Sequence, residues 1–411
     1  MDTLNQAIIV GNGAYAVNEN HLDIKTPSSE NLFIYRYVAG KQFNTSGKLQ
    51  NNVLCGLVAL TTGDDGDQIL APNAVLVNKG VIDLHLKDLY DEHIRKSKAD
   101  QSYKVDALRA YAMAAGENSV LINEGTINIY MDYDKDAETT MYCCAMWAEG
   151  NSMLVNKGEI HFYGNGSYQS LVRGVGGVAN NLHVENEGLI TVDVERAFQT
   201  RILHSAGMDG SLVNKGKIDV NVAGRVMTVG SVTGTTMIND GEINVVSRAT
   251  LIEGKIPYLF NFPPMATGMY EHFRPGKKLP APIVNRGTIK VHLIGSEKSG
   301  DDAIAFGFCY QMEDKDANME TPARFVSNEG KVEVTQEGPK EYITAELGAN
   351  MQLKFDNPVK FKVLRWNTDK KSKVLACRSA EFDLSESNLN ADAVYQTDFG
   401  KQNGMTMKVI K

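Results

Sequence analysis

The stretch LVNKGEIHF, residues 154–162, recurs in near-copies along the chain and decides the fold. Each copy contains Asn, one variable residue and Gly, followed by two apolar residues that are separated by a polar one. A motif repeated in one register indicates that each copy is one structural unit of a repeat protein. The asparagines of the eight copies are Asn78, Asn123, Asn156, Asn186, Asn214, Asn239, Asn285 and Asn328.

The residues around each Asn-X-Gly predict two strands joined by a corner. After Gly216, the apolar residues Ile218 and Val220 flank the polar Asp219. This alternation, which is rich in β-branched residues, is typical of a strand with one buried face. A short apolar segment before each Asn predicts a second strand that ends there. Asn and Gly accept left-handed or otherwise costly backbone angles, so Asn-X-Gly is interpreted as a corner.

Two architectures use such corners. In an antiparallel sandwich the motif would be the tip of a hairpin, and the copies would have no reason to resemble one another. In a parallel β-solenoid, equivalent residues of successive coils stack at ~4.8 Å, and stacked asparagines pair amide to amide. The intervals between the asparagines are 45, 33, 30, 28, 25, 46 and 43 residues. The four shorter intervals suit a coil of three short strands, and the three longer ones suit the same coil with an inserted loop.

The variable residue of the motif favours the solenoid. Its charge alternates in sign along the chain, and opposite charges attract where neighbours stack. Each exposed pair stabilises by only a few tenths to ~1 kcal/mol, so the alternation is interpreted as control of register. The residues are Lys79, Glu124, Lys157, Glu187, Lys215, Asp240, Arg286 and Glu329.

A third strand-like segment lies between the corners in most units. Its small residues and glycines suit a tightly packed inner wall. Examples are RAYAMAAG (109–116), MYCCAMWAEG (141–150), LVRGVGGVA (171–179), RILHSAG (201–207), RVMTVGSV (225–232) and AIAFGFCY (303–310). The predicted fold is therefore all-β, a right-handed parallel β-helix with three strands per coil and terminal caps.

The ends and interruptions of the repeat define the expected organisation. Residues 1–70 are predicted to form an N-terminal cap with the first strands, because solenoid ends need protected edges. Residues 71–335 form the repeats, with inserted loops at 87–108 and 254–281. Residues 336–411 form C-terminal coils and a cap.

The inserted segment 254–281 is the candidate ligand-binding loop. It holds five of the eleven prolines, which predicts that it leaves the strand ladder. An aromatic and basic loop projecting from a rigid rod suits contact with a glycan or a protein. In the alternative interpretation its aromatic residues cover the flank of the helix or a neighbouring subunit. The candidate residues are Tyr258, Phe260, Phe262, Tyr270, Phe273 and Arg274.

Composition excludes several classes of function. A net charge of −8 and a pI near 5.6 argue against nucleic acid and anionic membrane as partners. No apolar segment approaches the ~18–20 residues that insert into a bilayer. No signal peptide is visible, so we expect either another export route or an excised fragment. The five cysteines include no CxxC pair and are expected to be small buried residues rather than disulfides or zinc ligands.

Catalytic and metal-binding patterns are weak. A glycan lyase or hydrolase would need two or three carboxylates that converge. The candidates by residue type are Asp83, Asp219 and Glu333, at the outward position of the strand after the corner. They are far apart along the stack, which favours a solvated face. The segment MDYDKDAE (131–138) lacks the glycine of an EF-hand and leaves a weak cation site or a solvated acidic loop. We predict no catalytic residue, no metal site and no cofactor, and we lean towards a protein without enzymatic activity.

The LVNKGxIxV units, over about residues 75–334, resemble the repeats of autotransporter passenger domains and filamentous-haemagglutinin-like bacterial adhesins. The tail from VKFKVLRWNTDKKSKVLACRSAEFDLS (359–385) onwards is similar to the strand-rich end of many passenger domains. The resemblance implies an extracellular or bacterial cell-surface location.

Three functions follow as hypotheses. The leading one is a non-enzymatic rigid scaffold in adhesion or assembly, which binds a glycan or cell-surface protein through its inserted loops. The second is a glycan-active β-helix of the tailspike, polysaccharide lyase or hydrolase type. The third is a subunit of a filament or homo-oligomer joined through its ends.

Overall fold

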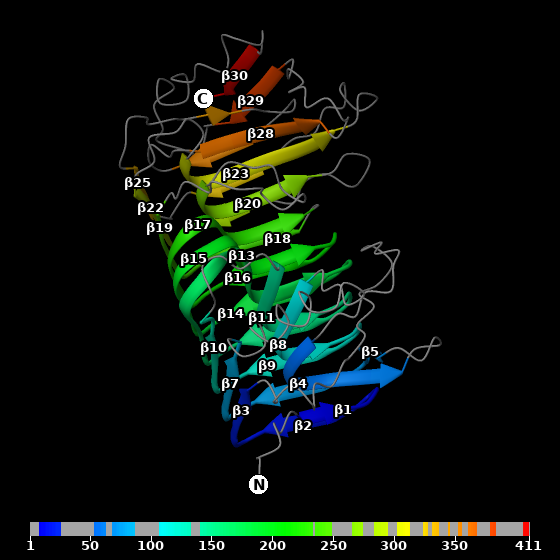
Figure 1. Ribbon diagram of the computed structural model, residues 1–411. Helices are drawn as coiled ribbons and strands as arrows, with labels where there is room; N and C mark the ends of the chain where they lie inside the picture. The colour runs from blue at the N-terminus through cyan, green and yellow to red at the C-terminus, as the bar shows by residue number, and fades with distance from the viewer. Residues whose placement is uncertain are drawn as a thin grey trace.

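A computed structural model of the chain describes residues 8–25, 53–62, 68–86, 107–132, 140–232, 235–248, 265–273, 283–294, 302–312, 324–327, 331–336, 344–345, 352–355, 361–367, 379–383 and 406–410. Every helix or strand assigned in these ranges is a β-strand, and the strands stack along one axis (Figure 1). Of the strand pairs described, only β4 (Val53–Thr62) with β5 (Gln68–Leu70) is antiparallel.

The strands before the corners form a sheet of their own, the first column, and eight of them end at the repeated Asn. It has ten parallel strands. They are β2 (Tyr15–Asn18), β6 (Val75–Asn78), β9 (Val120–Asn123), β12 (Met153–Asn156), β14 (His183–Asn186), β16 (Ser211–Asn214), β18 (Thr236–Asn239), β21 (Ile283–Asn285), β24 (Arg324–Ser327) and β27 (Gln352–Phe355).

The strands that follow the corner form the second column. They are β3 (His21–Lys25), β7 (Val81–His85), β10 (Thr126–Tyr130), the first parts of β13 (Glu159–Val178), β15 (Leu189–Ala206) and β17 (Lys217–Val232), and then β19 (Glu242–Arg248), β22 (Thr288–Ile294) and β25 (Lys331–Gln336).

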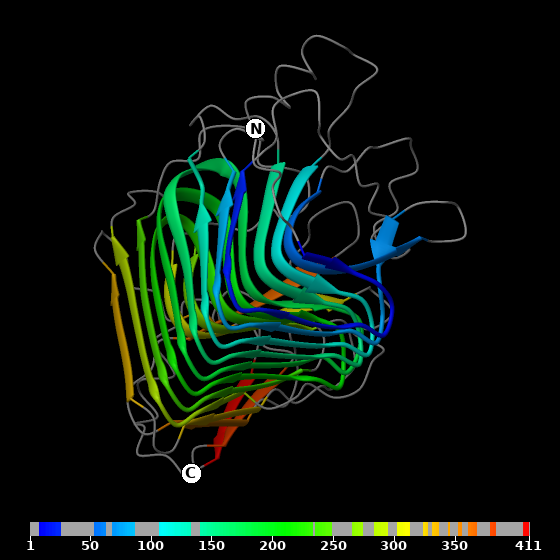
Figure 2. The same ribbon diagram turned by 90° about the horizontal axis from the view of Figure 1, so that it is seen from below.

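The third column completes each coil. In β13, β15 and β17 the chain passes from the second column to the third without a break, and these strands appear as arcs in Figure 2. The other members are β1 (Ile8–Val10), β4, β8 (Ala107–Ala115), β11 (Thr140–Ala148), β20 (Met265–Phe273), β23 (Asp302–Met312) and β28 (Phe361–Asn367), with the short β26 (Thr344–Ala345) beside β28.

One core runs along the axis inside the three columns. In the second column, the residues four places after each ladder Asn are register partners of one another and are all fully buried. Their burial explains why the repeat requires an apolar residue at that position. These residues are Ile82, Ile127, Ile160, Ile190, Ile218, Ile243 and Ile289. The predicted parallel β-helix with three strands per coil is confirmed.

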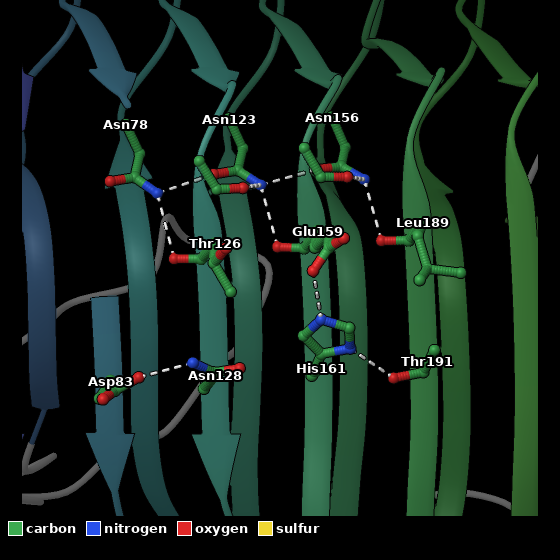
Figure 3. A network of polar contacts seen from close by, with 12 residues as sticks. Asn78, Asp83, Asn123, Thr126, Asn128, Asn156, Glu159, His161, Leu189 and Thr191 are labelled. Atoms are coloured by element: carbon green, nitrogen blue, oxygen red, sulfur yellow. Dashed lines mark hydrogen bonds and ion pairs between the residues drawn. The ribbon is translucent and has the colours of Figure 1, made fainter. Parts of the chain in front are cut away.

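The asparagines form the predicted ladder. The amide nitrogen of each one donates to the amide oxygen of the next at 2.8 Å, from Asn18 through Asn285. Figure 3 shows the part from Asn78 to Asn156. All eight side chains are at most 1% exposed. Asn18 is an additional member that the sequence pattern missed because Asn20 replaces the corner Gly, and Asn328 lies outside the described residues.

The predicted corner is present, but its glycines do not use left-handed backbone angles. None of Gly80, Gly125, Gly158, Gly188, Gly216, Gly241 and Gly287 has a positive φ, yet a Cβ at each would lie 2.0–2.1 Å from a backbone oxygen of the preceding corner. Glycine is therefore needed because the stacked corners approach closely. Positive φ angles occur instead between the third and first columns, at Asn73, Asn118, Asn151, Asn181 and Asp209.

The alternating charges line the outside of the corner. Arg286 forms a two-pronged pair with Asp240 at 2.6 and 2.8 Å, and Nζ of Lys215 lies 4.0 Å from Glu187. Glu19 extends the alternation to the first coil. These groups are exposed or partly exposed, so their effect on the free energy of unfolding is small.

Several predicted boundaries shift. The segment predicted as an N-terminal cap contains a complete corner, between β2 and β3. The predicted loop 254–281 is interrupted by β20, which pairs with β17 and β23, and β8 begins at Ala107, inside the predicted loop 87–108. After residue 336, β27 and β28 continue the first and third columns, whereas β29 (Ser379–Asp383) and β30 (Thr406–Ile410) pair with each other.

The cysteines behave as small buried residues where their side chains are described. Cys55, Cys143 and Cys144 are free thiols, and burial raises the pKa of Cys55 and Cys143 to about 12. Cys143 points into the axial core and Cys144 to the opposite face of the same strand. The side chains of Cys309 and Cys377 lie outside the described part of the chain.

Candidate functional site

The carboxylates singled out from sequence do not converge. Asp83, Asp219 and Glu333 lie on the outer face of the second column in β7, β17 and β25. Three strands separate β7 from β17 in the ladder, which places Asp83 and Asp219 ~19 Å apart along the axis. Asp83 accepts a hydrogen bond from Asn128 at 2.7 Å (Figure 3), and Asp219 accepts one from Asn244 at 2.8 Å. Asp83 and Asp219 therefore take part in polar contacts between neighbouring strands of this face.

The candidate loop is only partly described. Tyr270 does not project from the rod: it lies in β20, is 4% exposed and is the register partner of Gly230. Phe273 ends the same strand. The physical reason is that both lie in a strand paired on two sides. Tyr258, Phe260, Phe262 and Arg274, and Asp134 and Asp136 of the acidic segment, lie outside the described residues.

The register of the described strands reveals where charges of one sign stack. A parallel in-register stack brings partner side chains together, so like charges are destabilising there. Among the described strand pairs, the charged partners Lys217–Glu242, Lys290–Glu333 and Glu381–Lys408 have opposite signs. Only two partner pairs of acids or of Lys and Arg have the same sign, Asp23–Asp83 and Arg173–Arg201. These two exceptions are the candidate ligand sites.

The Asp23–Asp83 pair is balanced by its neighbours. Nε2 of His21 lies 2.8 Å from Asp83, Nε2 of His85 lies 3.0 Å from Asp23, and Nζ of Lys25 lies 2.9 Å from Asp23. The hydrogen bond from Lys25 lowers the pKa of Asp23. Ligand atoms of Asp23, Asp83 and His85 lie within 4.8 Å of one another, a set that could hold a cation. The prediction of no metal site did not consider this group, because the first coil had not been recognised.

The Arg173–Arg201 pair has a different environment. Both side chains lie on the outer face of the third column, each 8% exposed, and Arg225 beside them is 3% exposed. Burial lowers the pKa of Arg173, and burial together with Arg173 and Arg225 lowers that of Arg201. Removing a guanidinium from water is costly unless a partner compensates it.

Several buried polar atoms around these arginines have no hydrogen-bond partner. They are Nη1 of Arg173, both side-chain amide atoms of Gln199, and Nε1 of Trp147. These atoms come from the three adjacent strands β11, β13 and β15, and Gln199 is the register partner of Arg225 in β17. An unsatisfied buried donor or acceptor costs ~1–3 kcal/mol, so these atoms lower the stability of the folded chain where no water or ion satisfies them.

Aromatic rings adjoin the arginines. Trp147 lies 5.9 Å from Tyr111 and 5.7 Å from His204, measured between ring centroids. Gly176 lies between Trp147 and His204 in the stack and is the register partner of both. Its lack of a side chain allows the two rings to approach, since a Cβ there would lie 2.3 Å from Nδ1 of His204. We call the set of Arg173, Arg201, Arg225, Gln199, Trp147 and His204 the basic-aromatic face.

His204 is expected to make the stability of the protein depend on pH. Its burial lowers its pKa well below the usual value, and Arg173 and Arg201 lower it further. Below pH ~6.5 the unfolded chain therefore takes up a proton that the folded chain does not. The free energy of unfolding falls by about 1.4 kcal/mol per pH unit from this group alone as the pH decreases.

Urea denaturation between about pH 5 and pH 7.5 measures this effect. His204→Phe, which keeps a buried ring, should lose this part of the slope. His183→Gln, which replaces an exposed histidine bonded to Ser211, serves as the control. An unchanged slope in His204→Phe would contradict the assignment.

Sequence reasoning missed the basic-aromatic face for a physical reason. The third column is buried on both faces, so apolar and polar residues do not alternate as they do in the second column. The usable signal was a single Arg within each of the apolar segments LVRGVGGVA, RILHSAG and RVMTVGSV. A charged residue is rarely buried without a specific role.

A comparison with known families agrees with this architecture. Residues 2–181 match the model of the BigA third pectate lyase-like domain. This is a β-helix-type domain of a bacterial surface protein. The match ends within the loop after β13, and the same three columns continue through β14, β15 and later strands. No curated protein matches the chain, and no solved structure does.

In the described residues no helix is long and apolar enough to cross a membrane.

Proposed function

We propose that the chain is a non-enzymatic, rigid β-helix scaffold of a bacterial surface or secreted protein that acts in adhesion or assembly. The observation that best supports a rigid scaffold is the asparagine ladder. Its seven hydrogen bonds of 2.8 Å join eight successive coils. A stack locked in this way holds groups at its surface in fixed positions. The likeness of residues 2–181 to a pectate lyase-like domain of BigA supports a location at the cell surface.

A glycan or a cell-surface protein is the proposed partner, and no cofactor is needed. The inserted segments on either side of β20 are the proposed place of contact, because β20 fixes both to one coil. Tyr258, Phe260 and Phe262 of the first of these segments are the proposed anchors, because aromatic side chains contribute much of the binding energy at protein contacts.

Substitution of the aromatic residues tests this. The full chain with Tyr258→Ser, Phe260→Ser and Phe262→Ser should bind host cells or a glycan array at least roughly tenfold more weakly, which corresponds to the ~1.4 kcal/mol or more that aromatic anchors contribute. The circular dichroism spectrum and Tm should not change. Tyr15→Ser, which removes an aromatic ring that is 69% exposed on β2, serves as the control. Wild-type binding by the triple variant would rule out this place of contact.

A glycan-active enzyme is the second candidate, and one observation favours it. His204 has a lowered pKa and is therefore a neutral base, and it lies beside Arg173 and Arg201. An acidic glycan lyase requires a base together with a cation that neutralises the carboxylate of the sugar. Incubation with acidic polysaccharides decides between the two: reproducible chain cleavage that His204→Phe abolishes would overturn a non-enzymatic role. Size measurement in solution tests the further alternative of a filament or homo-oligomer subunit.

A further inference from the structure

We infer that the outer face of the first column, over the four coils of β2, β6, β9 and β12, is the contact surface for a second copy of this chain. The two rods lie antiparallel about a two-fold axis. The inference goes beyond the proposed adhesion function, because it concerns the side of the rod and not the inserted segments. It also differs from assembly through the ends, since a two-fold side contact closes on itself at two copies.

Two rows of apolar side chains cover this face. Strand alternation directs the first and third residues of each of these four-residue strands outward, and the register places them side by side. Tyr15 is 69% exposed and Met153 is 44% exposed; Val77 and Val155 are buried, and the other four are partly exposed. We call the eight residues the apolar patch. They are Tyr15, Val75, Val120 and Met153 in one row, and Val17, Val77, Ile122 and Val155 in the other.

Polar residues border the apolar patch on three sides. Along its corner edge runs the row of alternating charges, and along its other edge runs the row of exposed asparagines with positive φ angles. In the next coil, His183 and Glu185 are the outward register partners of Met153 and Val155. An apolar centre within a polar rim is the usual anatomy of a protein–protein interface, and contiguous apolar side chains at a surface mark interaction sites.

The corner charges favour a second copy in antiparallel orientation as the occupant. A two-fold axis that runs along the strands, between β6 and β9, places β2 opposite β12 of the second copy and β6 opposite its β9. The same rotation brings Glu19 opposite Lys157 and Lys79 opposite Glu124, and each of these pairs occurs twice. All four side chains are exposed. Every corner contact is then between opposite charges, whereas a shift by one coil would bring like charges together.

The size of the face suits a weak and reversible dimer. Four strands spaced ~4.8 Å apart, and six residues of ~3.3 Å each between the two polar rows, give a face of roughly 19 Å by 20 Å. This area of ~400 Å² per copy lies at the low end of specific interfaces, so we expect association in the micromolar range. At the nanomolar concentrations of a cell-binding assay the chain is then monomeric, and Tyr15→Ser remains a valid control there.

Sedimentation equilibrium of the full chain between about 1 and 200 μM tests the proposal, and we expect a monomer–dimer equilibrium. Ile122→Lys, at the centre of the apolar patch, should weaken association by roughly tenfold or more, because it brings a charge into an apolar contact. Ile238→Lys is the matched control and should associate as the wild type does. Ile238 has the same repeat position and is also partly exposed, but it lies in β18, three coils beyond the patch. A monomer at every concentration, growth beyond a dimer, or equal effects of the two substitutions would overturn the proposal.

A charge exchange tests the antiparallel orientation. Lys79→Glu should weaken the dimer several-fold, because it brings two carboxylates together at both places where Lys79 faces Glu124. The double variant Lys79→Glu with Glu124→Lys should recover wild-type association, since opposite charges again meet across the two-fold axis. Within one rod the exchange places like charges beside Glu19 and Lys157, so the recovery cannot come from the stack itself. These side chains are exposed, so the Tm of both variants should stay close to that of the wild type. A double variant that associates no better than Lys79→Glu would refute the antiparallel arrangement.

Discussion

Gly158→Ala is expected to lower the free energy of unfolding by about 4 kcal/mol or more, although it adds only one methyl group. A Cβ at this position would lie 2.0 Å from the carbonyl oxygen of Gly125 and 2.8 Å from the carbonyl carbon of Glu124. Both are backbone atoms of the preceding corner, whose own position is fixed by hydrogen bonds from Lys157 and Gly158 to Asn123. The added methyl group can be accommodated only if the two coils separate at the corner.

Urea denaturation of the two proteins measures the difference. Gly230→Ala is the matched control, because a Cβ there meets no atom closer than 3.7 Å and Gly230 has no positive φ. The control should be neutral or stabilise by ~0.4–1 kcal/mol through the lower entropy of the unfolded chain. Equal losses in the two variants would mean that close approach is not the reason for the corner glycine.

The corner shows how far sequence reasoning reaches. The repeat of Asn-X-Gly predicted where the chain bends, but the reason for the glycine depends on a neighbouring coil that is 25 to 60 residues away. Asn20 illustrates the point: it occupies the glycine position of the first described coil, and no described coil lies beneath it for its Cβ to contact. Its carbonyl oxygen is in turn the atom that a Cβ at Gly80 would meet, at 2.0 Å. A search that required Gly therefore missed the first coil.

The three columns differ in how well they could be predicted. The first and second columns repeat one pattern of residue types in the coils from β6 to β22, so the ladder of Asn78 to Asn285 and the buried isoleucines followed from sequence alone. The third column has no shared residue type, and its inward and outward side chains are both buried. β20 was hidden for the same reason, because its small and aromatic residues between proline-rich segments were interpreted as part of a loop. Sequence also could not show that Arg173 and Arg201 are partners, since that depends on a register set over 28 residues of intervening chain.

The second large effect is expected for Asn156→Ala, which should lower the free energy of unfolding by about 3 kcal/mol. The side chain of Asn156 is fully buried and lies in the middle of the ladder. It accepts from Asn123 at 2.8 Å and has a longer contact to the backbone oxygen of Leu189 (Figure 3). It also donates to Asn186 at 2.8 Å and contacts the backbone oxygen of Gly158.

The loss does not fall equally on the two neighbours. After the substitution Nδ2 of Asn123 keeps its contacts to the backbone oxygens of Gly125 and Glu159, at 3.2 Å each. Oδ1 of Asn186, in contrast, loses the donor that Asn156 supplied, and a buried acceptor without a donor carries the full desolvation penalty. The cavity left by the amide adds to this loss.

Urea denaturation of Asn156→Ala checks the magnitude, and Asn165→Ala is the matched control. Asn165 is exposed and donates one hydrogen bond to Asp132 at 2.9 Å, so its removal should change the free energy of unfolding by less than about 0.5 kcal/mol. A double-mutant cycle with Asn123→Ala then isolates the ladder bond, because the two substitutions should be less than additive. Additive losses would show that the asparagines stabilise their own corners separately, and that the bonds between coils do not hold the rod together.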